Sequence, residues 1–521
     1  MLWPVNRRRA LRVAGFRSLV GPQRIRMNTS YSSRPRSKRP LLIVALLVLA
    51  AVLIAGGILL RPRFESAPPQ ITLTPDAEVL GVAPLAIRIS DSGTGLKAIS
   101  VTLSQGGTDH TLAAEQLAQP AAEKTLAVEA AKISGLKEGP AVLRIVARDA
   151  AWFRGNETVL ERTLAVDTTP PTLELIADDR YINFGGVGAI VYKASPDTAT
   201  SGVKLGSHFF PGFAGQIKDR PDHFIALFAH PYDTPADARP MLVATDKAGN
   251  TREQRIGYEL KNVNYRKSTI ALSDAFLQNK ILPLITDATA RQGSPRETFI
   301  AVNKKLRQEN ERRIAEITSK ATPAKQWQGA FAQLSNSKVE ANFADARTYT
   351  YNGEAIDTAL HLGYDLSVTK QYPVEVANSG TVVFTGDLGI YGNTVIIDHG
   401  LGLFTLYSHL SSIDTKVGDA VAKRQIIGKT GETGLAAGDH LHYGVYLHGV
   451  AVLPVEWWDQ KWIDDNITPK LEGRGGAEVA LATPAGKPGT AQKRATKATG
   501  ASGKSGTKSG ARSSTKKSSQ R

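Results

Sequence analysis

The chain has 521 residues, which is too long for one compact domain, so several domains are expected. It contains no cysteine, which excludes a disulfide framework and every thiolate metal site. Its net charge of +16 lies at its two ends: residues 1–40 hold eleven Lys and Arg without an acid, and ten more follow Glu478. The body between these ends is mildly acidic.

Residues 41–60 form an uninterrupted run of apolar and small residues (LLIVALLVLAAVLIAGGILL). At about 1.5 Å per residue, such a helix crosses a hydrocarbon layer of about 30 Å. We therefore predict an uncleaved transmembrane helix; the alternative is a cleaved signal peptide, whose apolar region is normally only about 7–15 residues long. The basic segment 1–40 is expected to stay in the cytoplasm, with residues 61–521 outside it. Met27 is an alternative start of the protein.

Two β modules are predicted, at 68–168 and 169–262, from short alternating runs separated by Gly, Asp and Ser clusters. The segment PPQITL at 68–73 recurs as PPTLEL at 170–175, an offset of about 100 residues, which is the size of an immunoglobulin-like sandwich. The modules resemble the Ig-like modules of bacterial envelope proteins. We expect both to be spacers; binding a protein regulator or covering the active site is the alternative.

Residues 265–337 are predicted to be a helical connector. Ser294 is a good N-cap, Pro295 suits the first turn, and Glu297 completes a capping box. Apolar residues then recur at helical spacing, with an interruption at Asn310. From 338 to 465 the pattern returns to β, and the Gly-, Ala-, Ser- and Lys-rich residues 466–521 predict a disordered basic tail. The fold class is therefore multidomain and mainly β.

Histidines and one aspartate in the last β region have spacings that suit a metal site. His361 and Asp365 would lie about 13 Å apart in a straight strand, so the backbone must turn between them, and Gly363 permits that turn. His440 and His442 share one face of a strand about 6.6 Å apart, so that one can bind metal while the other reaches a substrate. Without cysteine, His and Asp are the ligands available for Zn²⁺.

This part of the chain, roughly residues 338–458, resembles the M23 family of zinc metallopeptidases, also called the LytM or lysostaphin type. The resemblance rests on several segments in family order: HLGYD at 361–365, GNTVIIDHG at 392–400, YSHL at 407–410, GKTG at 428–431 and HLH at 440–442. It implies an antiparallel β peptidase domain with one Zn²⁺ per site, held by His361, Asp365 and His442. It implies His409 and His440 as the catalytic residues. Asp439 departs from the family, in which Pro is commoner at this position.

The resemblance implies a zinc metalloendopeptidase that hydrolyses peptide cross-links of bacterial peptidoglycan. Together with the apolar segment, it predicts a single-pass protein of the bacterial inner (cytoplasmic) membrane, with its catalytic domain in the periplasm or cell-wall space. His440 is expected to be the general base and His409 to stabilise the oxyanion, although the two roles can be exchanged. His399 and His448 are not assigned to the site.

Three other functions are consistent with parts of this sequence. A non-hydrolytic LytM-type regulator that activates another cell-wall hydrolase would normally have lost these ligands. A mononuclear iron oxygenase also uses two His and a carboxylate, but it would leave His409 and His440 without a role. Specific nucleic-acid binding by the basic tail is disfavoured because aromatic stacking residues are absent there. The cross-link that is cut, and any closure of the site by the preceding modules, stay open.

Overall fold

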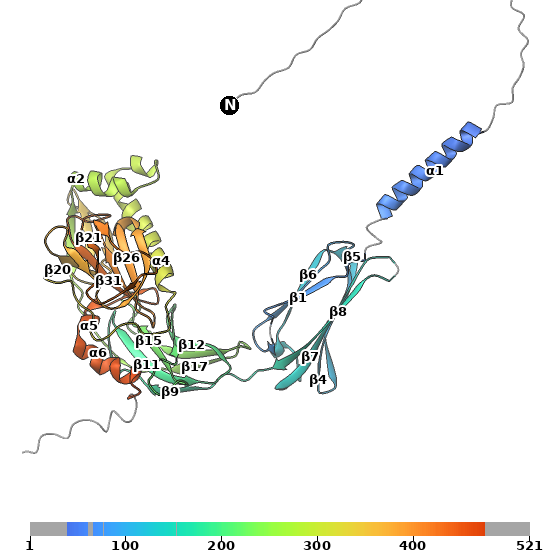
Figure 1. Cartoon of the computed structure of the whole chain (residues 1–521), viewed down its shortest axis with the longest axis horizontal. Helices are drawn as coiled ribbons and strands as arrows, with labels where there is room; N and C mark the ends of the chain where they lie inside the picture. Colours follow the sequence, from blue (N-terminus) through green and yellow to red (C-terminus); the bar gives the residue numbers. More distant parts are fainter. Residues whose placement is uncertain (1–38, 61–65, 77, 153, 475–521) are drawn as a thin grey trace, which may run out of the picture. The chain divides into compact units, whose positions relative to one another are not determined.

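The computed structural model describes residues 39–60, 66–76, 78–152 and 154–474 (Figure 1). Most of the predicted basic N-terminal segment and residues 475–521 of the predicted tail therefore lie outside the described residues. The chain divides into two compact units: most of the residues up to 164 form the first, and residues 79–84, 129–139 and 165 onward form the second. Each is described by itself.

A single long apolar helix, α1 (Arg39–Leu60), lies at the N-terminal end of the described residues. Its segment Leu42–Leu60 has a mean hydropathy of 3.1, and none of it is buried inside the protein. The helix is long and apolar enough to cross a membrane, although a signal sequence has the same properties. The predicted helix is confirmed, and membrane anchoring stays a prediction.

The first unit contains two sheets. One has the order β1-β3-β6, and in the other β8, β7, β4 and β5 are neighbours in that order. Alternate residues of β3 are buried, as expected for a strand with one face toward a core. The immunoglobulin-like topology of this module stays a prediction. The strands are β1 (Gln70–Thr74), β3 (Leu85–Ser90), β4 (Leu96–Gln105), β5 (Thr108–Ala121), β6 (Glu123–Val128), β7 (Gly139–Asp149) and β8 (Glu157–Val166).

The second unit begins with another two-sheet module, with strand orders β14-β15-β11-β9 and β13-β12-β16-β17. A short parallel pair, β10 with β18, lies beside it in the sequence. The bounds are β9 (Leu173–Ala177), β10 (Tyr181–Asn183), β11 (Val187–Ala194), β12 (Thr198–Leu205), β13 (His208–Pro211), β14 (Phe213–Ala214), β15 (Phe224–Ala229), β16 (Met241–Asp246), β17 (Thr251–Arg255) and β18 (Glu259–Lys261).

This second module shares one hydrophobic core with the C-terminal domain. Ile190 and Phe228 belong to the same buried cluster as Val445 and Trp457. The boundary also contains buried polar contacts, among them an ion pair of Asp179 with Lys470. The second module is thus part of the body that carries the candidate site, and its role as a spacer stays a prediction.

The predicted helical connector starts with a strand instead. β19 (Lys267–Leu272) pairs in parallel with β21 (Ala346–Tyr351), which pairs in turn with β22 (Glu354–Leu360). The expectation of helix there is wrong because the short alternating segment finds a strand partner far along the sequence. Helical structure follows in α2 (Asp274–Phe276), the π-helix η3 (Leu277–Ile281), the 3₁₀ turns η4 (Leu282–Leu284) and η5 (Ala290–Gln292), α3 (Pro295–Ile300), the π-helix η6 (Ala301–Leu306) and α4 (Arg307–Thr318). The Ser294 capping box of α3 is confirmed.

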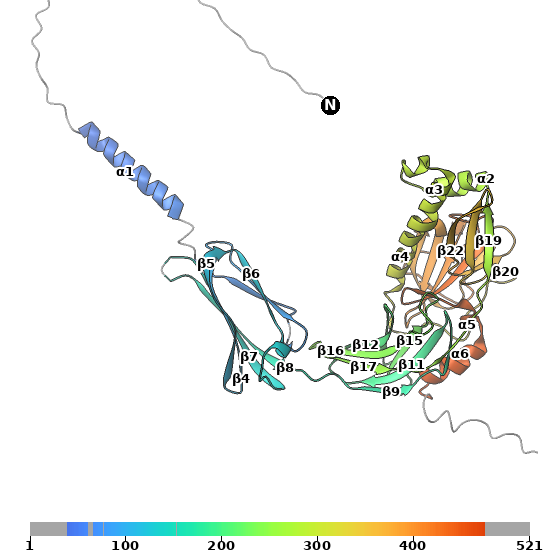
Figure 2. The ribbon, with the colours of Figure 1, turned by 180° about the vertical axis from the view of Figure 1, so that it is seen from behind.

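An eight-stranded sheet, in the order β20-β23-β31-β27-β26-β25-β29 with β32 on β31, dominates the C-terminal domain. One face packs on a cluster that includes Phe299 and Ile314 of the helices, and the other belongs to the core shared with the second module. Both views show α4 along the side of this sheet (Figures 1 and 2). The strands are β20 (Lys338–Ala341), β23 (Tyr364–Ser367), β25 (Gly380–Asp387), β26 (Asn393–Asp398), β27 (Leu403–Ser408), β29 (Ala420–Val421), β31 (Leu441–Leu447) and β32 (Val450–Val452).

Smaller elements complete this domain. A second sheet has the order β24-β30-β28, from β24 (Pro373–Glu375), β28 (Ser412–Ile413) and β30 (Ile426–Lys429). The short helices α5 (Pro454–Trp458), α6 (Gln460–Asn466) and α7 (Thr468–Leu471) follow. Disorder was predicted from residue 466 onward, which is wrong for α7: its Lys470 is buried, because it pairs with Asp179.

Candidate functional site

Three neighbouring strands bring the predicted site residues together. Asp365 on β23 is directly opposite His442 on β31, and Ser408 at the end of β27 is opposite His442 on its other side. Facing side chains on adjacent strands lie about 5 Å apart. This register therefore places Asp365 and His442 in one cluster, next to the residue that follows Ser408 at the end of β27. That residue is His409.

His361 reaches the cluster from the segment just before β23. Gly363 is needed between them, but for a different reason than we predicted: its φ is not in the left-handed region. A Cβ at Gly363 would lie 2.7 Å from Cε1 of His442, so a side chain there would collide with the imidazole. The glycine provides space for the cluster.

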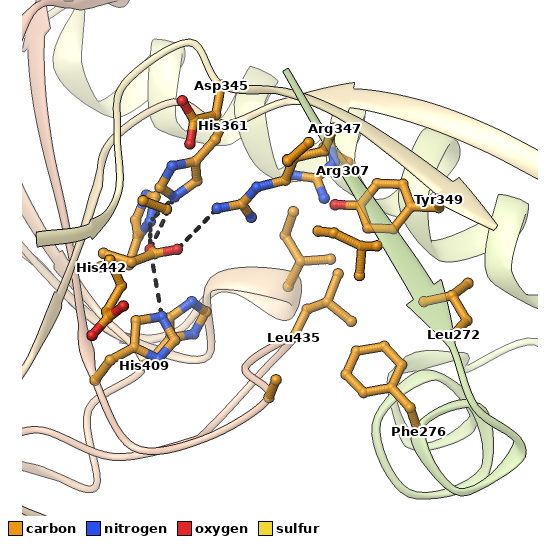
Figure 3. Close-up of a pocket in the computed structure, with 18 of the residues that line it drawn as sticks. Leu272, Phe276, Arg307, Asp345, Arg347, Tyr349, His361, His409, Leu435 and His442 are labelled. Carbon is orange, nitrogen blue, oxygen red and sulfur yellow. Dashed lines mark hydrogen bonds and ion pairs between the residues drawn. The ribbon is translucent and has the colours of Figure 1, made fainter. Parts of the chain in front are cut away.

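The side chains of His361, Asp365 and His442 converge on one point. His361 and His442 can be followed in Figure 3. Oδ1 of Asp365 lies 2.9 Å from Nε2 of His361 and 3.0 Å from Nδ1 of His442. The two imidazole nitrogens are 3.0 Å apart. Both histidines are buried, and Asp365 is partly buried. All three predicted ligands are therefore brought together.

The donor set of this cluster fits a metal ion. Nδ1 of His361 lies 2.9 Å from the carbonyl oxygen of Asn342 and donates to it, so Nε2 turns a lone pair toward the Asp365 carboxylate. Two such acceptors at 2.9 Å repel each other unless a cation lies between them. Two imidazole nitrogens and one carboxylate oxygen are the donor set of catalytic metal sites that keep one position open.

His409 and His440 lie beside the cluster, with ring centroids 4.8 Å apart. Nδ1 of His409 donates to the Thr433 carbonyl at 2.8 Å, and Nδ1 of His440 donates to the Gly438 carbonyl at 2.8 Å. In the neutral rings, each Nε2 is then the acceptor nitrogen, and that of His440 is 3.4 Å from Oδ1 of Asp365. His409 has a φ of +64°, an unusual conformation for a residue with a side chain.

The protonation states suit metal binding and base chemistry. Burial lowers the pKa of His442 to about 4. Burial, with His440 and His442 nearby, also holds the pKa of His409 well below its usual value. Burial alone would raise the pKa of Asp365, but the charge of His361 and the hydrogen bonds of His361, His440 and His442 hold that pKa well below 3.8. At neutral pH, Asp365 is therefore ionised and His442 is neutral, as metal ligands must be, and His409 is neutral as well.

The pKa of His440 shifts the other way. Burial lowers it, but the hydrogen bond and the charge of Asp365 outweigh burial, and the pKa rises above 6.5. His440 is also the most exposed of the four site histidines, with 18% of its side chain accessible. It is therefore the imidazole best placed to exchange a proton with an incoming molecule.

Two supporting residues were missed from the sequence. Arg347 on β21 donates from a terminal nitrogen to Oδ2 of Asp365 at 2.9 Å, so it orients the carboxylate that faces the cluster. The Asn342 carbonyl fixes the tautomer of His361. Nothing in the local sequence marks either residue, because both depend on how the strands before His361 fold back. His399 and His448 lie outside the cluster, as predicted.

A cavity of about 530 Å³ opens onto the cluster. One end is lined by the site histidines and Asp365. The rest is lined by side chains from β19, β21 and the helices and by Leu435 of the loop before β31. Figure 3 shows Leu272, Phe276, Tyr349 and Leu435 in this wall. The candidate site is thus accessible, and it has an apolar wall next to the metal-binding end.

The β-sheet domain, the three converging ligands and the two further histidines define a metallopeptidase-type centre. Residues 359–454 match the family model "Peptidase family M23", so this part of the chain is an M23-type domain.

Proteins of known activity are similar in sequence to this part of the chain. The DD-carboxypeptidase/endopeptidase Mpg of Neisseria meningitidis is 41% identical over 96 residues, which are 18% of this chain and 22% of that protein. Peptidoglycan DD-endopeptidase ShyA of Vibrio cholerae is 36% identical over 112 residues, 22% of this chain and 25% of that protein. The chain therefore spans about a quarter or less of the length of these two relatives. Among solved structures, the catalytic domain of lysostaphin from Staphylococcus simulans is 30% identical, with 24% of this chain and 92% of that domain covered and a TM-score of 0.20.

Proposed function

We propose that this chain is a zinc metalloendopeptidase, anchored in the bacterial inner membrane through α1, that hydrolyses peptide cross-links of peptidoglycan outside the cytoplasm. The observation that carries the proposal is the approach of His361, Asp365 and His442 to within 3.0 Å of one another at one end of an open cavity. The printed activities of the relatives, a DD-carboxypeptidase/endopeptidase and a DD-endopeptidase, support this class of substrate.

In this proposal, Nε2 of His361, Nδ1 of His442 and Oδ1 of Asp365 would hold Zn²⁺, because these three atoms face one another. Zinc in such a site supplies a water of lowered pKa and polarises the scissile carbonyl. Arg347 holds the second carboxylate oxygen, so that Oδ1 stays directed at the ligand position. The Asn342 carbonyl keeps Nε2 of His361 unprotonated.

His440 acts as the general base. Its Nδ1–H is held by the Gly438 carbonyl, so its Nε2 is the atom that accepts the proton of the attacking water and later passes it to the leaving amine. His409, held by the Thr433 carbonyl, lies on the other side and donates to the oxyanion once it carries a proton at Nε2. Because the pKa of His409 is low, its ring is neutral at rest. The negative charge that develops on the oxyanion favours the protonated ring, which would take this proton from solvent and return it to solvent when the intermediate collapses.

Digestion of purified sacculi of known cross-link chemistry tests the function. The full-length chain in detergent, loaded with zinc, should release fragments with new free amino termini in stem or bridge peptides, detected by mass spectrometry. His440→Ala should keep its zinc and lose turnover by about 10²–10⁴-fold. His110→Ala, which removes a histidine of the first unit, is the matched control and should be fully active.

The outcomes separate the competing functions. Cleavage confined to the glycan strands would refute the endopeptidase. Zinc bound by the wild-type chain without hydrolysis of any sacculus would instead support a non-hydrolytic regulator.

A further inference from the structure

The cavity over the site contains an arginine that neither the family motifs nor the proposed mechanism uses. Arg307 is the first residue of α4, directly after the π-helical segment Ala301–Leu306, and it lines the same cavity as the histidine cluster. Its side chain is half-buried. Figure 3 shows it on the same side of the cavity as Arg347 and Tyr349.

The guanidinium of Arg307 is held in place by a buried residue one turn earlier. Its Nε donates to the backbone carbonyl of Asn303 at 3.2 Å, and a terminal nitrogen donates to Oδ1 of Asn303 at 3.0 Å. Asn303 is 2% exposed and is fixed in turn by hydrogen bonds to Asp357 Oδ2 at 2.9 Å and to the Thr358 carbonyl at 3.3 Å. The arginine fork is thus preorganised, so binding an anion costs little further side-chain entropy.

Each carboxylate of the cavity has at least one partner, although Oδ1 of Asp345 is buried without one. Asp365 is held by the histidine cluster and Arg347, and Glu340 pairs with Lys338 at 2.9 Å. Asp345 accepts from the Asn342 backbone N–H at 3.1 Å. In the described part of the chain, no carboxylate lies within 4.0 Å of the Arg307 guanidinium, whose hydrogen bonds go only to neutral oxygens of Asn303. Glu311, one turn further along α4, interacts with Arg307 through its charge but forms no ion pair with it within 4.0 Å. A half-buried guanidinium that lines a cavity and is not neutralised by an ion pair favours binding of an anionic group there.

We propose that Arg307 is a specificity-determining residue that binds a free carboxylate of the peptide substrate. The inference rests on the proposed endopeptidase function and narrows its substrate class to peptides with an unamidated carboxylate close to the scissile bond. The carboxylate lies either at the C-terminus of the peptide or on one of its side chains. The apolar wall of the cavity takes the hydrocarbon part of the same residue.

Two pairs of synthetic cross-linked peptides test this proposal. The peptides of one pair differ only by a C-terminal carboxylate or carboxamide, and those of the other only by a side-chain carboxylate or carboxamide. The zinc-loaded full-length chain is compared with Arg307→Met and Arg307→Lys. The matched control is Lys305→Met, which removes a positive charge from an exposed neighbouring residue that does not line the cavity.

In one of the two pairs, the wild-type chain should cleave the acid with a kcat/KM about 10- to 100-fold above that of the amide, the ratio expected for one charge-assisted bidentate contact. Arg307→Met should abolish this preference by slowing cleavage of the acid and leave the amide within about 2-fold. Arg307→Lys should restore part of the preference, and Lys305→Met should retain all of it. The pair that shows the preference identifies which carboxylate is bound.

Two results would overturn the inference. The first is equal cleavage of the acid and amide peptides, in both pairs, by the wild-type chain. The second is an equal loss of kcat/KM on the acid and the amide in Arg307→Met, which would indicate a purely structural role. If the wild-type chain cleaves no peptide at all, the proposed function fails, but the inference is still tested by calorimetric binding of the same acid and amide peptides. Equal affinities for both would refute it.

Discussion

Glu456 provides a quantitative test of how tightly the second β module is joined to the peptidase domain. Its side chain lies in α5 and is 4% exposed, where it accepts hydrogen bonds from Asn183 Nδ2 at 2.8 Å and from the Val187 backbone N–H at 2.9 Å. Both partners belong to the second module. Burial raises the pKa of Glu456 to about 8, against the opposing effect of these two hydrogen bonds.

The sign and size of the effect follow from this shift. Between the unfolded pKa near 4.5 and the folded pKa near 8, the folded state holds a proton that the unfolded state has lost. The contribution of Glu456 to the free energy of unfolding is therefore complete below pH 4.5 and is lost as the pH rises through 8. At 1.36 kcal/mol for each pKa unit, the loss is about 5 kcal/mol.

Glu456→Gln keeps the shape of the side chain without its ionisation. Its free energy of unfolding relative to the wild-type chain should rise by about 5 kcal/mol between pH 4.5 and 8.5, because only the wild-type protein loses this proton. Urea unfolding followed by tryptophan fluorescence measures the difference, since Trp457 is adjacent and buried in the shared core. Glu472→Gln, at an exposed glutamate in the same region, is the control and should show no such pH dependence. A constant difference between Glu456→Gln and the wild-type chain over this range would show that Glu456 ionises normally and that the boundary is hydrated.

Two further predictions concern the proposed metal ligands. Arg347→Met removes the hydrogen bond to Oδ2 of Asp365 and should weaken zinc binding about 10- to 100-fold in a chelator competition. The control Arg312→Met, on the exposed face of α4, should leave the zinc affinity unchanged. Equal zinc affinities of the two variants would refute an orienting role of Arg347. Gly363→Ala places a Cβ against the imidazole of His442 and should abolish stoichiometric zinc binding while the circular dichroism spectrum is kept. Gly257→Ala, where the structure leaves open space, should bind zinc normally, and retained zinc in Gly363→Ala would contradict the steric argument.

The convergence of the site residues could be predicted because it depends on local periodicity and a family pattern. Alternation along β31 places His442 on one face of the sheet and Tyr443 in the core on the other, as the sequence indicates. The supporting residues could not be predicted in the same way. Arg347 reaches Asp365 from β21, a strand whose position is set by pairing with β19, which lies far away in the sequence and was expected to be helical.

The shared core between the second module and the peptidase domain was missed for a related reason. The sequence pattern of the second module predicts an independent sandwich, because alternation along a strand does not show whether the outer face of the sheet contacts water or another domain. The sequence signal, a nearly continuous apolar β15 (FIALFA), is typical of a strand that is buried on both faces.

Asn310 shows how the helical segment enters the site. In the sequence it only interrupts an apolar stripe, but its buried Oδ1 accepts the backbone N–H of Ile390 at 2.9 Å, and the adjacent Tyr391 carbonyl accepts the N–H of His409 at 2.9 Å. The segment matched by the family, residues 359–454, contains all three predicted ligands, yet α4 holds the loop behind His409 and contributes Arg307 to the cavity. The family segment thus contains the proposed ligands and part of the cavity wall, whereas Arg307 and the rest of the wall come from residues before it. Relatives that match only in that segment are therefore expected to share the reaction and to differ in the peptides they cut.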